Sequence, residues 1–269
     1  MMSMQTLTAT EHAPVKKVHF TGRKLLPWLV PGLLIIGWQV ASMLNVLPAS
    51  ILPSPVDVLK QGVKLWQTGD LQTNLSISLY RASIGFLIGG SLGFGLALLT
   101  ALSKTARALL DSSIQMLRNI PHLSLIPLII IWFGIGETAK ISLVAIGVLF
   151  PIYINTYQGL TTGDKSLLEM GRSYGLSKTK LFTRIIFPGA LPSILNGVRY
   201  ALGVMWTTLI VAETIASSSG IGYMSTNAQD FLDMKTILLC IAIYALLGKL
   251  SDLMAKWLEG ILLDWQQKG

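Results

Sequence analysis

Residues 82–102 have the sequence ASIGFLIGGSLGFGLALLTAL, which contains no charged side chain. The hydrocarbon core of a bilayer needs about 20 consecutive apolar residues for one spanning helix, and this stretch is long enough. Two further windows, Leu25 to Leu47 and Ile141 to Thr162, are also free of charge. Length and composition therefore predict three membrane-spanning helices at these places.

Three weaker windows contain or adjoin a few charged residues: Asn119 to Gly136, Leu191 to Ala216, and Thr236 to about Trp257. The first of them follows Asp111 and Arg118 in what looks like one helix, the second is interrupted by Arg199 and Glu213, and the second half of the last carries Lys249 and Asp252. Together the windows give six spans. The expected fold is all-α, a polytopic membrane protein with six transmembrane helices.

The composition of the whole chain indicates that lipid is its solvent. Of its 269 residues, 52% are hydrophobic and 13% are charged, an apolar excess that no globular core of this length needs. The net charge of +8 could indicate nucleic acid, but Lys and Arg lie in short segments between apolar runs and not on one polar face. We therefore expect a lipid bilayer as partner, and no nucleic acid.

The chain has few residues of the types that enzymes and metal sites need. Cys240 is the only cysteine and lies in an apolar run, so neither an internal disulfide nor a cysteine-rich metal site is expected. The histidines His12, His19 and His122 are too scattered for a metal cluster. The sequence holds neither the Gly-x-x-x-x-Gly-Lys-Ser/Thr loop that cradles phosphates nor a His-Glu-x-x-His helix. We therefore expect no catalysis and no bound cofactor on this chain itself.

Positive charge predicts the orientation, because cytoplasmic loops retain Lys and Arg. With the N-terminus inside, the outer segments hold four such residues: Lys60, Lys64, Lys140 and Lys235. The inner segments hold thirteen: Lys16, Lys17, Arg23, Lys24, Lys104, Arg107, Lys165, Arg172, Lys178, Lys180, Arg184, Lys256 and Lys268. We therefore expect both termini in the cytoplasm. The first apolar stretch has no small-residue cleavage site after it, so it is expected to be a retained span and not a signal peptide.

The expected organisation is a cytoplasmic N-terminal segment (residues 1–24), a transmembrane domain (25–262) and a cytoplasmic tail (263–269). Two connections are long. The outer one, Pro48 to Asn74, has a proline-rich turn and then four apolar residues at helical spacing: Val56, Leu59, Val63 and Trp66. It predicts a short helix at the outer surface. The inner one, residues 163–188, is the more informative.

The inner connection predicts two short helices around a glycine. Ser166 and Glu169 have the spacing of a capping box at the start of the first helix. Gly175 stands where a left-handed C-terminal cap is expected, Ser177 can cap a second helix, and Pro188 is expected to close it. Each helix repeats apolar residues on one face: Leu167, Met170, Gly171 and Tyr174 in the first, and Leu181, Phe182, Ile185 and Ile186 in the second. Such an amphipathic pair on the cytoplasmic side indicates a partner protein.

In its residues and their spacing, this connection resembles the Glu-Ala-Ala loop of binding-protein-dependent ABC importer permeases. In that family the loop docks a short coupling helix into a groove on the ATPase. Met170 and Gly171 stand where the family has its two alanines, and Phe187 replaces a leucine. The resemblance implies an ATPase-coupling loop built on six residues: Glu169, Met170, Gly171, Gly175, Ile185 and Pro188.

Most of the chain after the first window is similar to the sulfonate, nitrate and taurine branch of that family, and the run from Ser113 to Ala139 looks most like aliphatic sulfonate permeases. The resemblance implies a type I ABC importer permease fold in a bacterial inner membrane. It also implies a second copy of the chain, two cytoplasmic ATPase subunits that bind ATP and Mg, and a periplasmic solute-binding protein. The expected function is import of a small organic anion, with aliphatic sulfonate as the expected substrate and taurine or nitrate as the alternatives. The rival class, a secondary transporter driven by an ion gradient, often shows paired halves, which we do not see in the sequence.

Four residues are candidates for the translocation pathway: Arg118, Asn119, His122 and Glu213. Arg118 is about eleven residues from Arg107, or about 16 Å along a helix, which is deep for a residue that reaches the membrane surface. It either attracts the anion or pairs with Asp111. Asn119 follows it in the same segment.

The other two pathway candidates also have structural alternatives. His122 lies beside two prolines, so it either satisfies a backbone carbonyl freed by a kink or touches the substrate. Glu213 either pairs with Arg81 or Arg199 or contributes to an outer gate. Lys249 and Asp252, three residues apart, are expected to form a local ion pair.

Overall fold

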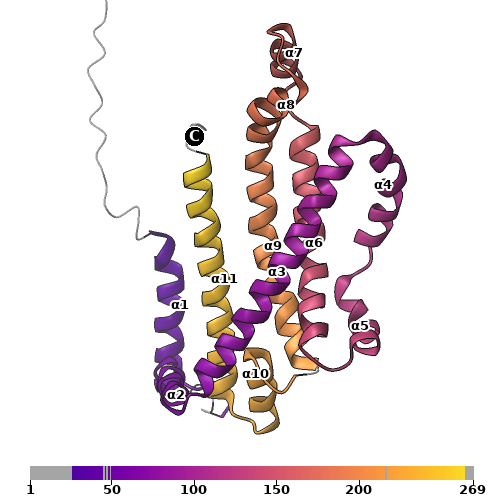
Figure 1. Ribbon diagram of the computed structural model, residues 1–269. Coiled ribbons are helices and arrows are strands. Elements are labelled where there is room, and N and C mark those ends of the chain that lie inside the picture. Colours follow the sequence, from indigo (N-terminus) through magenta and orange to yellow (C-terminus); the bar gives the residue numbers. More distant parts are fainter. Residues whose placement is uncertain (1–25, 45, 47, 49, 216, 264–269) are drawn as a thin grey trace, which may run out of the picture.

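The computed structural model describes residues 26–44, 46, 48, 50–215 and 217–263, and these residues form helices without any strand. Figure 1 shows long helices standing side by side, with short ones at both ends. Their bounds are α1 (Leu26–Met43), α2 (Pro55–Thr68), α3 (Asp70–Leu102), α4 (Lys104–Arg118), the 3-10 helix η2 (His122–Leu125), α5 (Ile126–Phe133), α6 (Glu137–Thr161), α7 (Lys165–Ser173), α8 (Lys178–Leu181), the π-helix η3 (Phe182–Ile186), α9 (Phe187–Ile215), α10 (Ile221–Asp230) and α11 (Met234–Leu262). The expected N-terminal segment, and all but Leu263 of the expected tail, lie outside the described residues.

Four helices are long and apolar enough to cross a membrane: α3, α6, the continuous run Lys178–Ile215, and α11. Helix α4 and the η2–α5 segment qualify only together, which gives a fifth span if the pair crosses as one. Helix α1 is apolar but shorter. The all-α class is therefore confirmed, and a count of six requires both α1 and the bent pair to cross.

The third expected span is not one continuous helix. Helix α4 ends at Arg118, and the η2–α5 segment is bent from it by 87°. Pro121 lacks the N–H that a helix would use, and Pro127 follows in the first turn of α5. The segment then stops at Gly134, whose φ of 75° suits only glycine without strain. The kink expected at this place is confirmed, whereas the single helix expected through residues 119–136 is wrong.

The centre of the molecule is formed by α3, α6 and α9, which pack side by side (Figure 1). The four-residue spacing of Gly85, Gly89 and Gly93 predicts a close helix contact of the small-xxx-small kind. The structure places this contact against α6 of the same chain, where a Cβ on Gly89 would collide with the backbone of Ala145. The same three helices bury an apolar cluster: Ala82, Val144, Val148, Ile152, Ala201, Met205, Trp206 and Leu209. The glycines are thus explained within one chain, without a second copy.

The outer connection forms the expected short helix. Ser54 caps the start of α2, and Gly69, with a φ of 88°, ends it. One side of α2 packs on α11, where Gln61 donates hydrogen bonds to Asp233 and Thr236. The four apolar residues that predicted the helix lie on its exposed side: Val56, Leu59, Val63 and Trp66.

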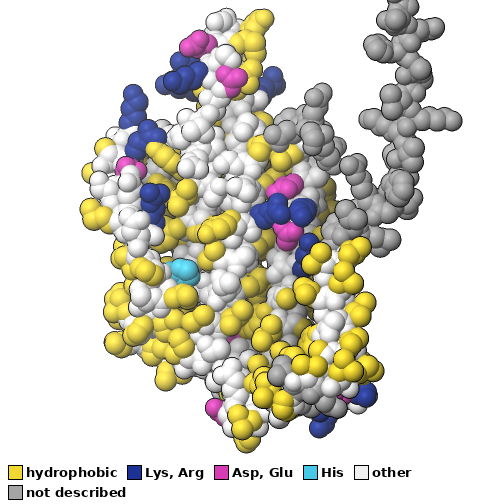
Figure 2. All heavy atoms as spheres, turned by 180° about the vertical axis from the view of Figure 1, so that it is seen from behind, with side chains coloured by type: hydrophobic (Ala, Val, Ile, Leu, Met, Phe, Trp, Pro, Cys, Tyr) yellow, Lys and Arg dark blue, Asp and Glu magenta, His cyan; other side chains and the backbone are white. Residues whose placement is uncertain are grey.

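The two ends of the bundle carry different segments. Figure 1 places the end of α3, the α7–α8 pair and the C-terminal end of α11 together at one end, and α2 and α10 at the other. Those segments expected to face the cytoplasm that the structure describes therefore share one end of the molecule. Figure 2 shows that charged side chains on one face gather at the α7–α8 end and in small patches below it, while the rest of this face is mainly hydrophobic or uncharged.

Candidate functional site

The expected coupling loop projects from the bundle as α7 and α8 (Figure 1). Helix α7 begins directly after Asp164, whose carboxylate accepts hydrogen bonds from the Ser166 hydroxyl at 2.6 Å and from the Ser166 backbone N–H at 2.8 Å. These bonds favour the charged carboxylate and hold the pKa of Asp164 below its ordinary value. The capping box expected from Ser166 and Glu169 is therefore wrong, because Asp164 caps the helix instead.

Gly175 ends α7 in the left-handed conformation, with a φ of 71°. Its N–H donates to the carbonyl of Arg172 at 2.9 Å, and the N–H of Leu176 donates to the carbonyl of Gly171 at 3.1 Å. These two bonds make a Schellman motif, which satisfies carbonyls at the end of a helix and reverses the chain. The expected left-handed cap is confirmed.

Gly171 lets the two helices of the loop lie close together. A Cβ at this position would be 2.7 Å from Cδ1 of Ile185 and 2.8 Å from Cδ2 of Leu181. A larger residue would therefore push η3 and α8 away from α7. By contrast, Glu169 and Met170 lie on the exposed side of α7. Among the residues expected in the coupling loop, Gly171 and Ile185 thus pack between the helices, whereas Glu169 and Met170 are exposed.

The second helix of the loop does not end at Pro188. Ser177 caps α8 by accepting the backbone N–H of Lys180, and the helix then continues through η3 into α9 as one run of 38 residues. In η3 the N–H of Phe187 bonds to the carbonyl of Phe182, five residues back. This wider turn carries the helix past Pro188, which has no N–H to contribute. The expected termination is wrong, and the coupling loop joins the membrane helix α9 without a break.

An apolar face of the coupling loop has no cover in the described part of the chain. Leu167, Met170 and Tyr174 are 46%, 50% and 80% exposed and share one side of α7. We call these three residues the coupling face. The same loop carries five basic residues, Lys165, Arg172, Lys178, Lys180 and Arg184, and two acidic ones, Asp164 and Glu169. An exposed apolar patch with a charged rim is typical of a protein-docking surface.

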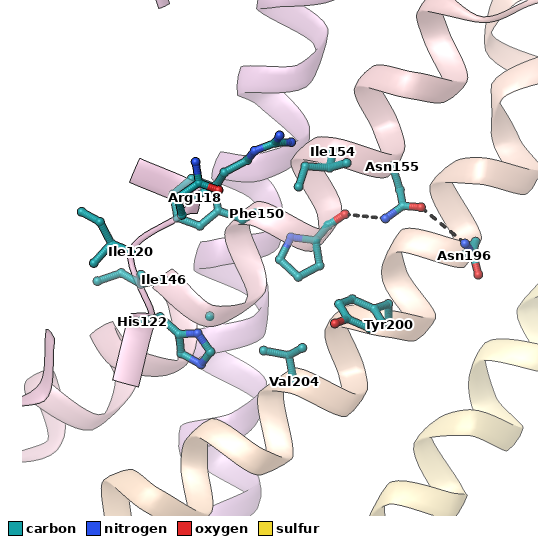
Figure 3. Close-up of a pocket in the computed structure, with 13 residues that line it drawn as sticks. Arg118, Ile120, His122, Ile146, Phe150, Ile154, Asn155, Asn196, Tyr200 and Val204 are labelled. Atoms are coloured by element: carbon teal, nitrogen blue, oxygen red, sulfur yellow. Dashed lines mark hydrogen bonds between the residues drawn. The ribbon is translucent and has the colours of Figure 1, made fainter. Parts of the chain in front are cut away.

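A cavity of about 580 Å³ lies between the α4–η2 segment, α6 and α9, and Figure 3 shows it with its lining residues. It brings together Arg118, Asn119 and His122, three of the four expected pathway residues. The other residues of its wall come mostly from the two long helices: Ile120, Ile146, Gly147, Phe150, Pro151, Ile154, Asn155, Asn196, Tyr200 and Val204. We call this space the α6–α9 cavity.

His122 is held by a side chain and not by a backbone carbonyl, which was one of its two expected roles. Its Nε2 lies 2.9 Å from the hydroxyl of Thr208, and that hydroxyl donates to the carbonyl of Val204 at 2.8 Å. With its proton engaged by Val204, the hydroxyl oxygen can accept a proton donated by Nε2. Gly147 makes room for the pair, since a Cβ there would lie 2.8 Å from the Thr208 oxygen.

Polar side chains of α6 and α9 meet across the cavity. Asn155 donates to the carbonyl of Pro151 at 2.9 Å and accepts from Asn196 at 3.4 Å (Figure 3). Tyr200, one turn beyond Asn196, is 64% exposed. The sequence analysis missed these residues, although polar positions four apart inside an apolar window are a signal for such a wall.

Arg118 does not pair with Asp111. Asp111 accepts a hydrogen bond from Gln115 at 2.8 Å, and among the described residues no acidic group forms an ion pair with Arg118. The guanidinium at the rim of the cavity is therefore available to an anion.

We expect Arg118→Lys to retain part of the substrate uptake and Arg118→Met to lose most of it. Lysine keeps the charge, whereas methionine keeps an apolar stem without charge. Both variants are tested by uptake of labelled substrate into cells that hold equal amounts of permease in the membrane. The control is Lys104→Met, at the exposed start of α4. Equal loss in both variants would mean that a geometry-specific contact, and not charge, matters at this position.

Glu213 lies outside the α6–α9 cavity, in a buried ion cluster at the opposite end from the coupling loop. Its carboxylate accepts Nη1 of Arg81 at 2.8 Å, and both side chains are fully buried. Arg81 also binds both oxygens of Glu137, with Nε at 2.6 Å and Nη2 at 2.5 Å. The pair expected with Arg81 is confirmed, and Glu137 is a partner that the sequence analysis did not find.

The ion cluster also fixes the segment between α9 and α10. Arg81 donates to the carbonyl of Ser219 at 2.7 Å, and Glu213 accepts the backbone N–H of Gly222 at 2.9 Å. Gly220, between them, has a φ of 107°. A Cβ there would run into the Glu213 carboxylate. One arginine thus joins α3, α6, α9 and the start of α10.

Known proteins are similar in sequence to this chain over almost its whole length. A family described as binding-protein-dependent transport system inner membrane component matches residues 89–260. The chain is 54% identical over 252 residues to the putative aliphatic sulfonates transport permease protein SsuC of Escherichia coli (strain K12), covering 94% of this chain and 95% of that protein. Identity to the protein of the same name in Bacillus subtilis (strain 168) is 42%, over 91% and 90% of the two chains. The taurine transport system permease protein TauC of Escherichia coli (strain K12) is 34% identical, over 87% and 86%.

A solved structure shares the fold. The chain superposes on one described as a crystal structure of an amino acid ABC transporter with histidines, with a TM-score of 0.61 at 19% sequence identity. The match covers 74% of this chain and 96% of that one. At this identity the likeness concerns the helical arrangement alone.

Proposed function

This chain belongs to the family of binding-protein-dependent transport system inner membrane components, and from that membership we propose that it is the permease subunit of an ATP-driven importer that carries an aliphatic sulfonate into the cell. The observation that carries the proposal is the 54% identity to the sulfonate permease relative over nearly the full length of both chains. A cavity rimmed by Arg118, without an acidic partner among the described residues, supports an anionic substrate.

The proposed assembly has two copies of this chain, two cytoplasmic ATPases and a periplasmic solute-binding protein. The exposed coupling face on a loop rich in charged residues supports docking of an ATPase, and the unbroken helix from α8 into α9 supports transmission of its movement to the cavity wall. ATP and Mg belong to the ATPase in this proposal. The permease contributes the path and the coupling loop.

The proposed topology has six spans in the bacterial inner membrane, with α1 and the bent α4–α5 pair both crossing and both termini in the cytoplasm. In a Cys240→Ser background, we expect a membrane-impermeant thiol reagent applied from outside to label single cysteines at Gln67 and Gln229, which are exposed at the α2–α10 end. It should not reach a cysteine at Thr179 in the coupling loop unless the membrane is first permeabilised. Labelling of Thr179 in intact cells would reverse the proposed orientation.

The second candidate function is import of taurine, which the 34% identity to the taurine permease relative favours less strongly. Competition for uptake distinguishes the two candidate substrates. Cells that produce this chain with its partner ATPase and solute-binding protein should take up labelled ethanesulfonate, and unlabelled alkanesulfonates should compete better than taurine or nitrate. Stronger competition by taurine would replace the sulfonate proposal with the taurine one.

A further inference from the structure

A compact charged cluster lies between α9 and α11, outside the ion cluster of Arg81. Three cations contact the carboxylate of Asp252: Arg199 through Nε at 2.6 Å, Lys256 at 3.1 Å and Lys249 at 3.8 Å. The expected pair of Lys249 and Asp252 is thus confirmed, with two further partners. Within the described part of the chain, no second carboxylate forms an ion pair with these cations. Three positive charges against Asp252 and Glu259, which lies three residues beyond Lys256 on α11, leave a local excess of one.

This excess lies within two helices that are apolar enough to span a membrane. Arg199 is sixteen residues from the end of α9 at Ile215, or about 24 Å at about 1.5 Å per residue. Asp252 is ten residues from the end of α11, or about 15 Å on the same measure. Both residues therefore lie in the half of their spans nearer the coupling loop, where a cation needs an acceptor and a bound anion supplies one.

A cavity of about 540 Å³ adjoins the cluster, and we call it the α9–α11 cavity. Its polar wall consists of Asn196, Arg199, Tyr200, Thr207, Ser251 and Asp252. It shares Asn196, Tyr200 and Val204 with the α6–α9 cavity, so the two spaces lie on either side of one ridge of α9. An anion in one cavity is therefore separated from the other cavity only by the width of α9.

The hydrogen bonds of Arg199 leave its outer edge unused. Asp252 accepts only Nε, and neither Nη atom has a hydrogen-bond partner among the described residues. The side chain is 39% exposed and lines the cavity. Two parallel N–H groups of a guanidinium match two oxygens of an oxyanion, which a lysine cannot reproduce.

We propose that the α9–α11 cavity is an oxyanion-binding site, in which Asp252 positions Arg199 through Nε and the two Nη groups of Arg199 bind a sulfonate or phosphate group. Lys249 and Lys256 supply the remaining positive charge. If the bound group is a sulfonate, it belongs to the transported substrate, and this assignment rests on the proposed function. The phosphate source is the headgroup of an anionic lipid.

Calorimetry tests the site on the full-length permease with its ATPase in nanodiscs of phosphatidylcholine, with ethanesulfonate as the probe. Arg199→Gln should lower the affinity by about tenfold or more, because a charge-assisted bidentate contact is lost. Arg199→Lys should lose less, because it keeps the charge, and it carries the test if Arg199→Gln does not fold. Lys235→Gln, an exchange of the same type at the far end of α11, should bind as the unmutated protein does.

A double variant separates binding from a merely structural pair. If Arg199 only neutralises Asp252, then Arg199→Gln with Asp252→Asn should restore ethanesulfonate affinity, and that result would overturn the proposal. If Arg199 binds the anion, the double variant stays as weak as Arg199→Gln.

A second set of nanodiscs, containing phosphatidylglycerol, identifies the source. If ethanesulfonate does not bind but phosphatidylglycerol is retained through purification and lost about tenfold in Arg199→Gln, the oxyanion is a lipid phosphate and the site stands. If neither probe depends on Arg199, the site is refuted. Failure of the unmutated complex to transport sulfonate would count against the proposed function alone, because binding is measured without transport.

Discussion

Gly175→Val should leave the permease in the membrane but separate it from its ATPase, lowering both co-purification of the ATPase and substrate uptake by about tenfold or more. The backbone at Gly175 has a φ of 71°, where a side chain meets a penalty of at least about 1 kcal/mol and a β-branched one meets more. The Schellman bonds to Gly171 and Arg172 then break, and α8 leaves α7 in another direction. Loss of direction matters more than loss of stability, because the coupling face must fit a partner.

Gly163→Val is the matched control for this experiment. Gly163 opens the same loop, but it lacks positive φ, and a Cβ there would have no neighbour within 4 Å. It should bind the ATPase and support uptake as the unmutated protein does. If Gly175→Val did so too, the loop would be a simple connector and the docking assignment would fail.

Arg81→Met should remove most of the folded permease from the membrane. The substitution leaves the fully buried carboxylate of Glu213 without its cation and deprives Glu137 of both hydrogen bonds. Removing one partner of a buried ion pair costs roughly 3–5 kcal/mol, and here one arginine serves two carboxylates. Thermal unfolding in detergent, followed by fluorescence-detected gel filtration, measures the loss.

The control for this prediction is Arg107→Met, because Arg107 is exposed and lies 5.0 Å from the ring of Tyr157 without an ion pair in the described part of the chain. It should melt within a few degrees of the unmutated protein. Adding Glu213→Gln to Arg81→Met should recover part of the stability, since it removes one stranded charge. An Arg81→Met protein as stable as the unmutated one would show that the cluster contributes no net stability.

The sequence predicted the parts of the fold that depend on local composition. Residues 82–102 lie within α3, and the residues 141–162 window lies almost wholly within α6, because an uncharged window of this length has few stable places outside a membrane. Hydropathy does not predict the 87° bend after Arg118, because a proline fits an apolar window as its neighbours do. It breaks the helix because it lacks the N–H that a helix would use.

The candidate sites were predictable mainly where their residues are close in sequence; the pair of Glu213 with Arg81, 132 residues apart, was expected only as one of several alternatives. Gly175 was found because a turn between two short amphipathic helices needs a left-handed residue. Arg118 and His122 were both predicted and lie in one cavity, because they are only four residues apart in the sequence. Thr208 and Glu137 were missed, because they meet His122 and Arg81 from 86 and 56 residues away, and no spacing within one helix encodes such a contact.

The central claim is that ATP hydrolysed on another chain drives an organic anion through this one. The most direct measurement is uptake of labelled ethanesulfonate into proteoliposomes that hold this permease and its ATPase, with the solute-binding protein outside. The account predicts accumulation only when the ATPase site faces ATP and Mg, and none under a proton or sodium gradient alone. Accumulation driven by an ion gradient without ATP would contradict it.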